Sequence, residues 1–252
     1  MTNFRLIARL DVKAPNLIKG VHLEGLRKLG DPQAFAQGYY ADGIDEIIYI
    51  DAVASLYERN TIIDLVRHTA ENVFIPITAG GGVRSVDDAR ALLRAGADKV
   101  AVNTAAVHRP ELIAELAEQF GSQCVVLSIQ AKSQGDHWEC YCDQGREHTG
   151  LDVLEWATRA HGLGAGEILL TSVDKEGTRK GFDVPLTRKV SDALNVPIIA
   201  SGGMGNLDHL LDVARNGNAH AVAMAHVLHY DVLALNDIRI FAQEAGLPVR
   251  AL

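Results

Sequence analysis

An internal repeat constrains the fold of this 252-residue chain more than any other feature. The stretch GIDEIIYIDA begins at Gly43, and the similar stretch GAGEILLTSV begins at Gly164, 121 residues later. A second pair shows the same spacing, because IPITAGGGV begins at Ile75 and VPIIASGGM begins at Val196. Two matches at one spacing predict a chain built from two similar halves, and such a duplication must be recognised before a fold is assigned.

Each half alternates apolar strands with helical patterns. Continuous apolar strands separated by helices are typical of parallel strands covered by helices. Eight such units in about 250 residues predict an α/β protein, a single (β/α)8 TIM barrel with half-barrels at about 1–121 and 122–252. An open, doubly wound sheet is the alternative, but two like halves close naturally into a barrel and leave no exposed edge.

Local signals place some of the connecting segments. The Asp-Pro pair at 31–32 predicts a helix start, with an N-cap followed by proline at the first helical position. A loop is expected over 12–20, which contains a proline and a glycine. We expect a hairpin arm over Trp138–Cys142, and a helix near Leu151–His161 that is capped by Thr149.

The composition narrows the classes of function. The net charge of −8 argues against a general surface for nucleic acid or anionic membranes. No apolar run is long enough for a transmembrane helix, and the first residues do not read as a signal peptide, so we expect a cytoplasmic protein. The cysteines Cys124, Cys140 and Cys142 are expected to be reduced, and their C-x-C spacing alone is a poor zinc signature, so no metal site is predicted.

Two glycine turns occupy equivalent places in the halves. TAGGGVRS spans Thr78–Ser85 and ASGGMGN spans Ala200–Asn206, each between an apolar strand and a helical pattern. Glycines let the backbone approach a ligand closely, and free N–H groups at a helix start point at an anion. A single glycine turn is usually only a tight turn, but the pair predicts a substrate with a phosphate at each end.

Polar residues directly follow most of the predicted strands. Strand ends are often polar because solvent begins there, but Asp11 stands between apolar neighbours, where a carboxylate can act as a general acid or base. Gln130 closes the equivalent strand of the second half, and its amide cannot transfer a proton at neutral pH. The strand-end residues are Asp11, Asp51, Thr78, Asn103, Gln130, Thr171, Ser201 and Ala225.

Charged residues stand at or near the beginnings of four strands. In a barrel they would gather at the amino ends of the strands, as two cations and two anions in a ring. Two interpretations stay open, a stabilising ion-pair network that closes the barrel floor, or a gate on a path for a small molecule along the axis. The four residues are Arg5, Glu46, Lys99 and Glu167.

Nine stretches along the whole chain carry a family resemblance. They are LDVK at 10–13, KG at 19–20, GDP at 30–32, DE at 45–46, AGGGVRS at 79–85, RAGADKVAVNTAAV at 94–107, FGSQC at 120–124, GAGEILLTS at 164–172 and IIASGGMG at 198–205. Together they resemble the HisF family, the cyclase subunit of imidazole glycerol phosphate synthase, an enzyme of histidine biosynthesis.

The resemblance implies a partner and a direction of transport. A glutaminase subunit would dock at the barrel floor as a heterodimer and release ammonia, with Asp98 in the contact surface beside Lys99. Ammonia would pass the four charged residues and react at the top with a bis-phosphorylated or sugar-nucleotide substrate. No cofactor is implied.

The resemblance also implies site residues. Asp11 and Gln130 occupy the catalytic positions, with Asp11 as the main acid or base and Gln130 orienting substrate or water. The first phosphate would contact Gly82, Asn103 and Thr104. The full implied set of substrate- and phosphate-binding residues is Lys19, Gly82, Asn103, Thr104, Thr171, Gly177, Ser201, Gly202, Gly203, Ala225 and His226.

Three departures from the family pattern leave alternatives open. The family has a second catalytic aspartate where Gln130 stands, Ala-Ser where this chain has Ala225 and His226, and Asp-Gly where it has Ala14 and Pro15. A general acid or base contributes ~10²–10⁴ in rate. The chain is therefore interpreted as the cyclase subunit, as a diverged subunit that forms an amidine on a sugar for surface polysaccharide, or as a non-catalytic activator of a glutaminase.

Overall fold

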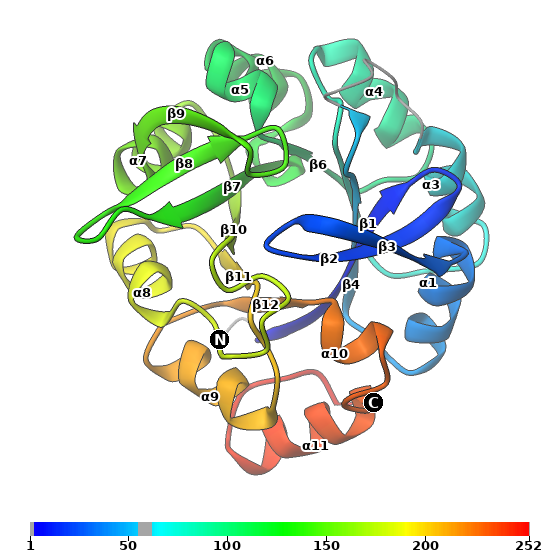
Figure 1. The fold of residues 1–252 in the computed structure, drawn as a ribbon. Coiled ribbons are helices and arrows are strands. Elements are labelled where there is room, and N and C mark those ends of the chain that lie inside the picture. The colour runs from blue at the N-terminus through cyan, green and yellow to red at the C-terminus, as the bar shows by residue number, and fades with distance from the viewer. Residues whose placement is uncertain (1–2, 55–61, 252) are drawn as a thin grey trace.

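A closed barrel of eight parallel strands forms the centre of the molecule (Figure 1). The computed structural model describes residues 3–54 and 62–251. Pairing between the fifth and sixth barrel strands, Val126 opposite Glu167, closes the ring. This confirms the predicted (β/α)8 barrel. The strands in order are β1 (Arg5–Lys13), β4 (Glu46–Asp51), β5 (Ile77–Gly80), β6 (Lys99–Val102), β7 (Val125–Ser133), β10 (Glu167–Ser172), β11 (Ile198–Ser201) and β12 (Ala221–Met224).

Helices surround the barrel on its outside (Figure 1). Within the part of the chain that the structure describes, none combines the length and the apolar character needed to cross a membrane. The longer helices are α1 (Pro32–Ala41), α3 (Ile63–Ala70), α4 (Val86–Arg94), α6 (Glu111–Phe120), α7 (Val153–Gly162), α8 (Val184–Ala193), α9 (Leu207–Arg215) and α11 (Leu235–Glu244). Short ones are α5 (Thr104–His108), the 3-10 turn η1 (Ser122–Cys124) and α10 (His226–His229).

Side-chain caps explain several helix starts. Asp31 accepts a hydrogen bond from the backbone N–H of Gln33, and Pro32 is the first residue of α1, as the sequence predicts. Ser85 accepts from the N–H of Asp88, whose carboxylate accepts in return from the Ser85 hydroxyl. The second glycine turn ends in the same way, because Asn206 caps α9 through the N–H of His209.

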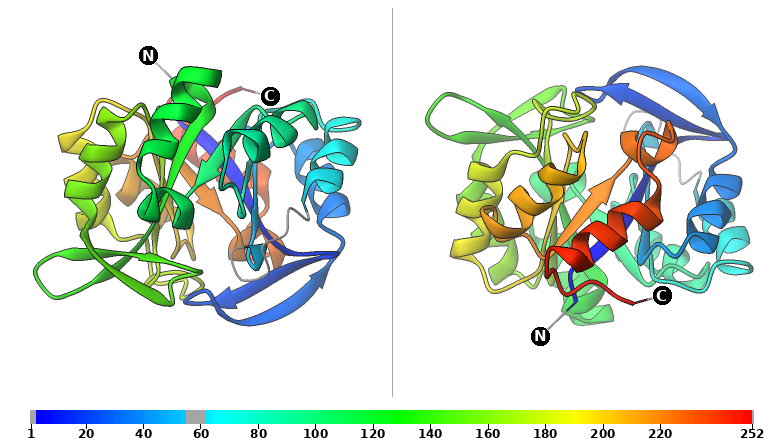
Figure 2. Two further views of the ribbon diagram at one scale, coloured as in Figure 1. Left: turned by 90° about the horizontal axis from the view of Figure 1, so that it is seen from above. Right: turned by 90° about the horizontal axis from the view of Figure 1, so that it is seen from below.

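Each half carries a two-stranded arm after its first barrel strand. The first arm is β2 (Asn16–Val21) with β3 (Glu24–Gly30), and the second is β8 (Trp138–Cys142) with β9 (Glu147–Asp152). Both arms extend from one end of the barrel, and the two termini lie at the other end (Figure 2).

Two local expectations were wrong. The segment 12–20 is not a loop, because β1 continues past the barrel and pairs antiparallel with β2, from Asp11 opposite Ile18 to Lys13 opposite Asn16. The expected strand at Trp138–Cys142 is present, but α7 is capped by Asp152 rather than by Thr149. The Thr149 hydroxyl instead donates to the Cys140 carbonyl within the second arm.

Alternation along the strands divides the core in two. Side chains that point outward pack against the helices, and those that point inward fill the barrel. The inner cluster is entirely aliphatic and occupies the middle of the barrel. It consists of Ile7, Ile48, Ile50, Ala101, Val126, Leu169, Ile199, Ala221 and Ala223.

Candidate functional site

The two ends of the barrel carry different chemistry. We call the end at the carboxyl termini of the strands the mouth, and the opposite end the floor. The glycine turns follow β5 and β11 directly, and these strands are parallel, so Gly82 and Gly203 lie at the mouth. Asp11 and Gln130 lie there too, near the ends of β1 and β7, which are opposite strands of the eight-membered ring.

The four charged residues at the floor form one connected ring. Arg5 donates to Glu46 at 2.8 Å and to Glu167 at 2.5 Å. Lys99 completes the ring through Glu167 at 2.7 Å and Glu46 at 3.4 Å. Burial would lower the pKa of Arg5, but the two carboxylates outweigh this and raise it. The ring therefore closes the floor with paired charges, beside a surface cavity of about 530 Å³.

A residue missed at the sequence level, Arg9, extends within the barrel beneath Asp11 toward β10 and β11. Its Nε donates to Asp11 Oδ1 at 3.0 Å, and its Nη1 donates to the hydroxyls of Thr171 (2.8 Å) and Ser201 (3.1 Å). Burial would lower the pKa of the guanidinium, but the charges of Asp11 and Glu176 raise it overall. The pair thus fixes one oxygen of the Asp11 carboxylate. Among the described residues, the other oxygen has no hydrogen-bond partner.

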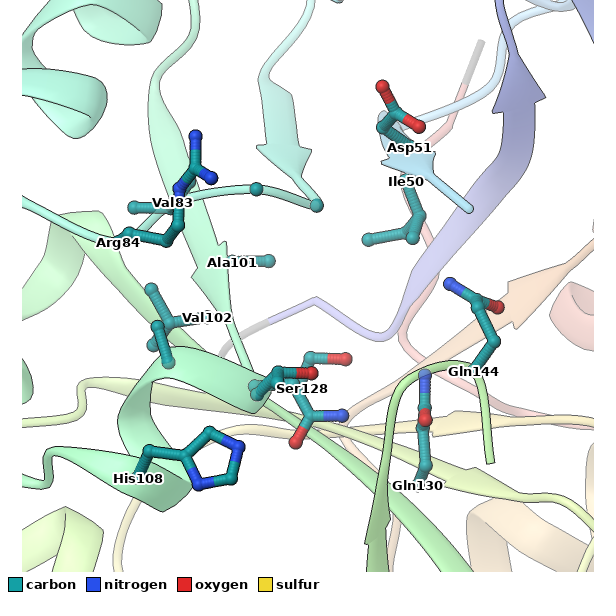
Figure 3. A pocket seen from close by; sticks show the side chains of 15 residues that line it. Ile50, Asp51, Val83, Arg84, Ala101, Val102, His108, Ser128, Gln130 and Gln144 are labelled. Carbon is teal, nitrogen blue, oxygen red and sulfur yellow. The ribbon is translucent and has the colours of Figure 1, made fainter. Parts of the chain in front are cut away.

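The first glycine turn borders a pocket of about 180 Å³ at the mouth (Figure 3). Gly82, Asn103 and Thr104 line it together, and Gln130 lies on the same wall as Gln144. Arg84 and His108 lie across the pocket, and both were missed at the sequence level. An arginine and a histidine beside a glycine turn can hold a phosphate through charge and backbone N–H groups.

Gln130 is held in one orientation by the second arm. Its Oε1 accepts from the backbone N–H of Gly145 at 2.7 Å, and the side chain is buried. Its Nε2 makes no hydrogen bond to any described residue, so its two donors are available to a ligand. This position can orient a substrate oxygen but cannot exchange a proton.

The second glycine turn borders a separate cleft. Ser201, Gly202 and Gly203 line it with Gly177, and Ala225 and His226 also line it. A side chain at Gly203 would overlap the Gly181 carbonyl, so close approach of two backbones requires glycine here. The pKa of His226 is lowered, first by burial and then by the charges of Arg179 and Lys19.

Lys19 ties the first arm to the second half of the barrel. Its ammonium contacts the Glu176 carboxylate, and both side chains are buried. The arm's turn is fixed to the same loop, because the N–H of His22 donates to the Glu176 carbonyl at 2.9 Å and His22 Nδ1 lies 2.8 Å from the Val173 carbonyl. Lys19 therefore reaches the mouth, but its charge is already paired. Thr171, the remaining predicted binding residue, contacts Arg9.

Two further groups lie outside this constellation. Asp98 is exposed at the floor, and its Oδ2 accepts from the N–H of Ile77 at 2.8 Å. Cys142, Asp143 and Glu147 bring one potential ligand atom each within 4.8 Å in the second arm. Burial raises the pKa of the Cys142 thiol to about 11, and a protonated thiol is a poor metal ligand.

Comparisons with known proteins agree with this arrangement. Residues 5–234 match the family described as histidine biosynthesis protein. A relative from Legionella pneumophila, named imidazole glycerol phosphate synthase subunit HisF, is 64% identical over 209 residues. The aligned part covers 82% of this chain and 99% of the relative. The floor ring, both glycine turns and Asp11 all lie within the residues that match the family.

Proposed function

The chain belongs to the histidine biosynthesis protein family as a HisF-type cyclase subunit of imidazole glycerol phosphate synthase, and from this premise we propose how its residues carry the reaction. Ammonia enters at the floor and reacts at the mouth with a substrate that bears two phosphates. The reaction yields imidazole glycerol phosphate and an aminoimidazole carboxamide ribotide. The partner that supplies ammonia is a glutaminase, which forms a heterodimer with this chain.

The observation that carries the proposal is that the expected substrate-binding and catalytic residues lie at one end of the barrel. Both glycine turns and Asp11 open on the mouth, while the ionic ring closes the floor. A substrate held at both phosphates, one at Gly82 and one at Gly203, would lie across the barrel axis. Its reacting centre would then lie above Asp11, at the end of any path along the barrel.

Asp11 is the proton-transferring residue of this proposal. The Arg9 contact holds one carboxylate oxygen, and the second oxygen acts as the base that removes protons from the attacking ammonia and the closing ring. Gln130 binds the substrate through its amide donors and holds it against the base. The phosphate sites supply orientation, which fixes the reacting atoms near each other.

The sequence also left open an amidine-forming sugar enzyme and a non-catalytic activator. The identity of 64% to a protein named imidazole glycerol phosphate synthase subunit HisF supports the cyclase subunit, and neither alternative is needed.

An assay with the purified chain tests the function without its partner. The chain is mixed with ammonium salt and the bis-phosphorylated ribotide precursor, and imidazole glycerol phosphate is measured. We expect product from the wild type and none from Asp11→Asn, while the variant still binds the ribotide. Binding without product in the wild type, or unchanged turnover in Asp11→Asn, would contradict the proposal.

A further inference from the structure

Arg9 occupies a layer of the barrel whose other members are small. An eight-stranded barrel is filled by layers that take one inward residue from each alternate strand. Following the strand registers around the ring, Arg9 shares its layer with Gly80, Ser128 and Ser201. The arginine is the one large side chain of this layer. Most of the apolar cluster lies toward the floor, with Ile50 as the exception, and Asp11 lies toward the mouth.

The guanidinium occupies one side of this layer. Its hydrogen bonds to Thr171 and Ser201 draw it toward β10 and β11. The mouth pocket descends on the other side, where its lining includes Ala101 of β6 and Ser128 of β7 (Figure 3). At this level, the pocket therefore occupies one side of the barrel interior and the Arg9 side chain fills the other. The open side lies beneath Gln130, and the filled side lies beneath the second glycine turn.

The charge of Arg9 adds to its shape. The pKa of the guanidinium is raised despite burial, so the group is a cation at every pH at which the protein works. It sits above most of the apolar cluster, in a medium that weakly screens charge. A cation is disfavoured beside it, whereas an uncharged ammonia molecule is not.

We propose that Arg9 is a positioning residue that couples the ammonia route to the reaction. It directs ammonia to the Ala101 and Ser128 side of the interior, and it holds Asp11 at the edge of that opening. This inference rests on the proposed function. It assigns to a single side chain two separable properties, the volume that fills one side of the barrel and the donors that orient Asp11.

Three substitutions separate these properties in the complex with a glutaminase partner. Arg9→Met keeps most of the volume and removes the donors. Arg9→Ala removes both, and Arg9→Ser repeats the opening with a polar group in case the alanine variant does not fold. The readouts are kcat with saturating ammonium salt and, with glutamine, the ratio of glutamate released to imidazole glycerol phosphate formed.

The expected results differ between the variants. In Arg9→Met, kcat with ammonium falls ~10²-fold because Asp11 is no longer held, while the glutamate-to-product ratio stays at the wild-type value. In Arg9→Ala and Arg9→Ser, kcat falls similarly and the ratio rises at least about twofold, because ammonia that is not directed escapes before it reacts.

A second buried arginine provides the matched control. Arg239 is as buried as Arg9 and pairs with Asp45 at 2.8 Å, outside the barrel. Arg239→Met should lower stability and leave both kcat and the ratio unchanged. If the Arg9 variants behave like Arg239→Met, or if Arg9→Ala keeps the wild-type ratio, the inference is wrong. A wild-type complex that forms no product overturns the proposed function, and this inference with it.

Discussion

The hydroxyl of Tyr39 lies 2.6 Å from Nδ1 of His229, and the two rings stack with an interplanar angle of 19°. The pair joins α1 to α10, and Phe35 packs edge-on against the histidine. Nε2 of His229 is buried without a hydrogen-bond partner in the described structure. Burial, the largest cause, lowers the pKa of His229 to about 4, so the ring is neutral in the folded protein.

This neutral histidine makes stability depend on pH. The unfolded chain binds a proton near pH 6.5, whereas the folded protein resists it until about pH 4. Neutral His229 should therefore make its full contribution to the free energy of unfolding above pH 6.5. The free energy of unfolding should fall as the pH drops from 6.5 toward 4, by at most about 3 kcal/mol. Denaturant unfolding at several pH values measures this slope.

A glutamine replacement provides the comparison. His229→Gln keeps an acceptor for Tyr39 but does not titrate, so its stability should change less between pH 6.5 and 4 than that of the wild type. His68→Gln, at an exposed histidine, should reproduce the wild-type slope. Equal slopes in all three proteins would show that His229 is not the titrating group.

Restoring a carboxylate at position 130 should raise the reaction rate. Gln130→Asp adds a second proton-transferring group at the mouth, and we expect an increase of up to ~10²-fold in product formation with ammonium salt. Gln130→Asn has the same length without the charge and controls for the lost contact to Gly145. A wild type that already matches both the rate and the pH dependence of Gln130→Asp would argue against a need for two carboxylates.

Removing one charge of the floor ring should separate the two sources of ammonia. Glu167 binds both cations of the ring, so Glu167→Gln leaves Arg5 and Lys99 with a single carboxylate. We expect a loss of about 1–3 kcal/mol in stability and lower turnover with glutamine, while turnover with ammonium salt is retained. Glu118→Gln, at an exposed position of α6, is the control. A parallel loss with both ammonia sources would contradict the gate.

Charge reversal at the floor tests the docking surface. Asp98→Lys places a cation on the face where the glutaminase is proposed to bind, and we expect the Kd of the complex to rise about tenfold. Asp98 also caps the N–H of Ile77, so Asp98→Asn, which keeps an acceptor, should perturb folding less. Titration calorimetry with the glutaminase measures both. An unchanged Kd in Asp98→Lys would place the interface elsewhere.

The spacing of the repeats in the sequence was sufficient to predict the parts of the fold that occur in both halves. The glycine turns at Gly82 and Gly203 recur at a fixed distance along the chain, which predicts both the barrel and the end at which the turns lie. The floor ring was predictable because strand beginnings converge in a closed barrel, and Arg5 and Glu167 do meet.

The features that could not be predicted depend on contacts between segments that are far apart in the sequence. Arg9 looked like one polar residue within an apolar strand, and only the closed barrel shows that it points inward beneath Asp11. The segment 12–20 contains Pro15 and Gly20, which locally favour a loop, yet Pro15 only forms the turn between β1 and β2, and antiparallel pairing with β1 makes the residues after it a strand. Arg84 stands inside the first glycine turn and His108 just after the stretch at 94–107, but no spacing marks either side chain as a site residue. They line one pocket only because β5 and β6 end side by side.

The first arm packs against residues of the second half, and this has a consequence for the architecture. The arm is rooted in the first half, but Leu23 at its turn is buried near Gly145 and Val173, and Lys19 finds its counter-charge in Glu176. Cutting the chain between α6 and β7 would leave Lys19 without its counter-charge and Leu23 exposed on one fragment. The residues that pair with them and cover them would be on the other fragment. Despite their common plan, the fragments would be complementary pieces that reassociate, rather than two interchangeable copies of one autonomous module.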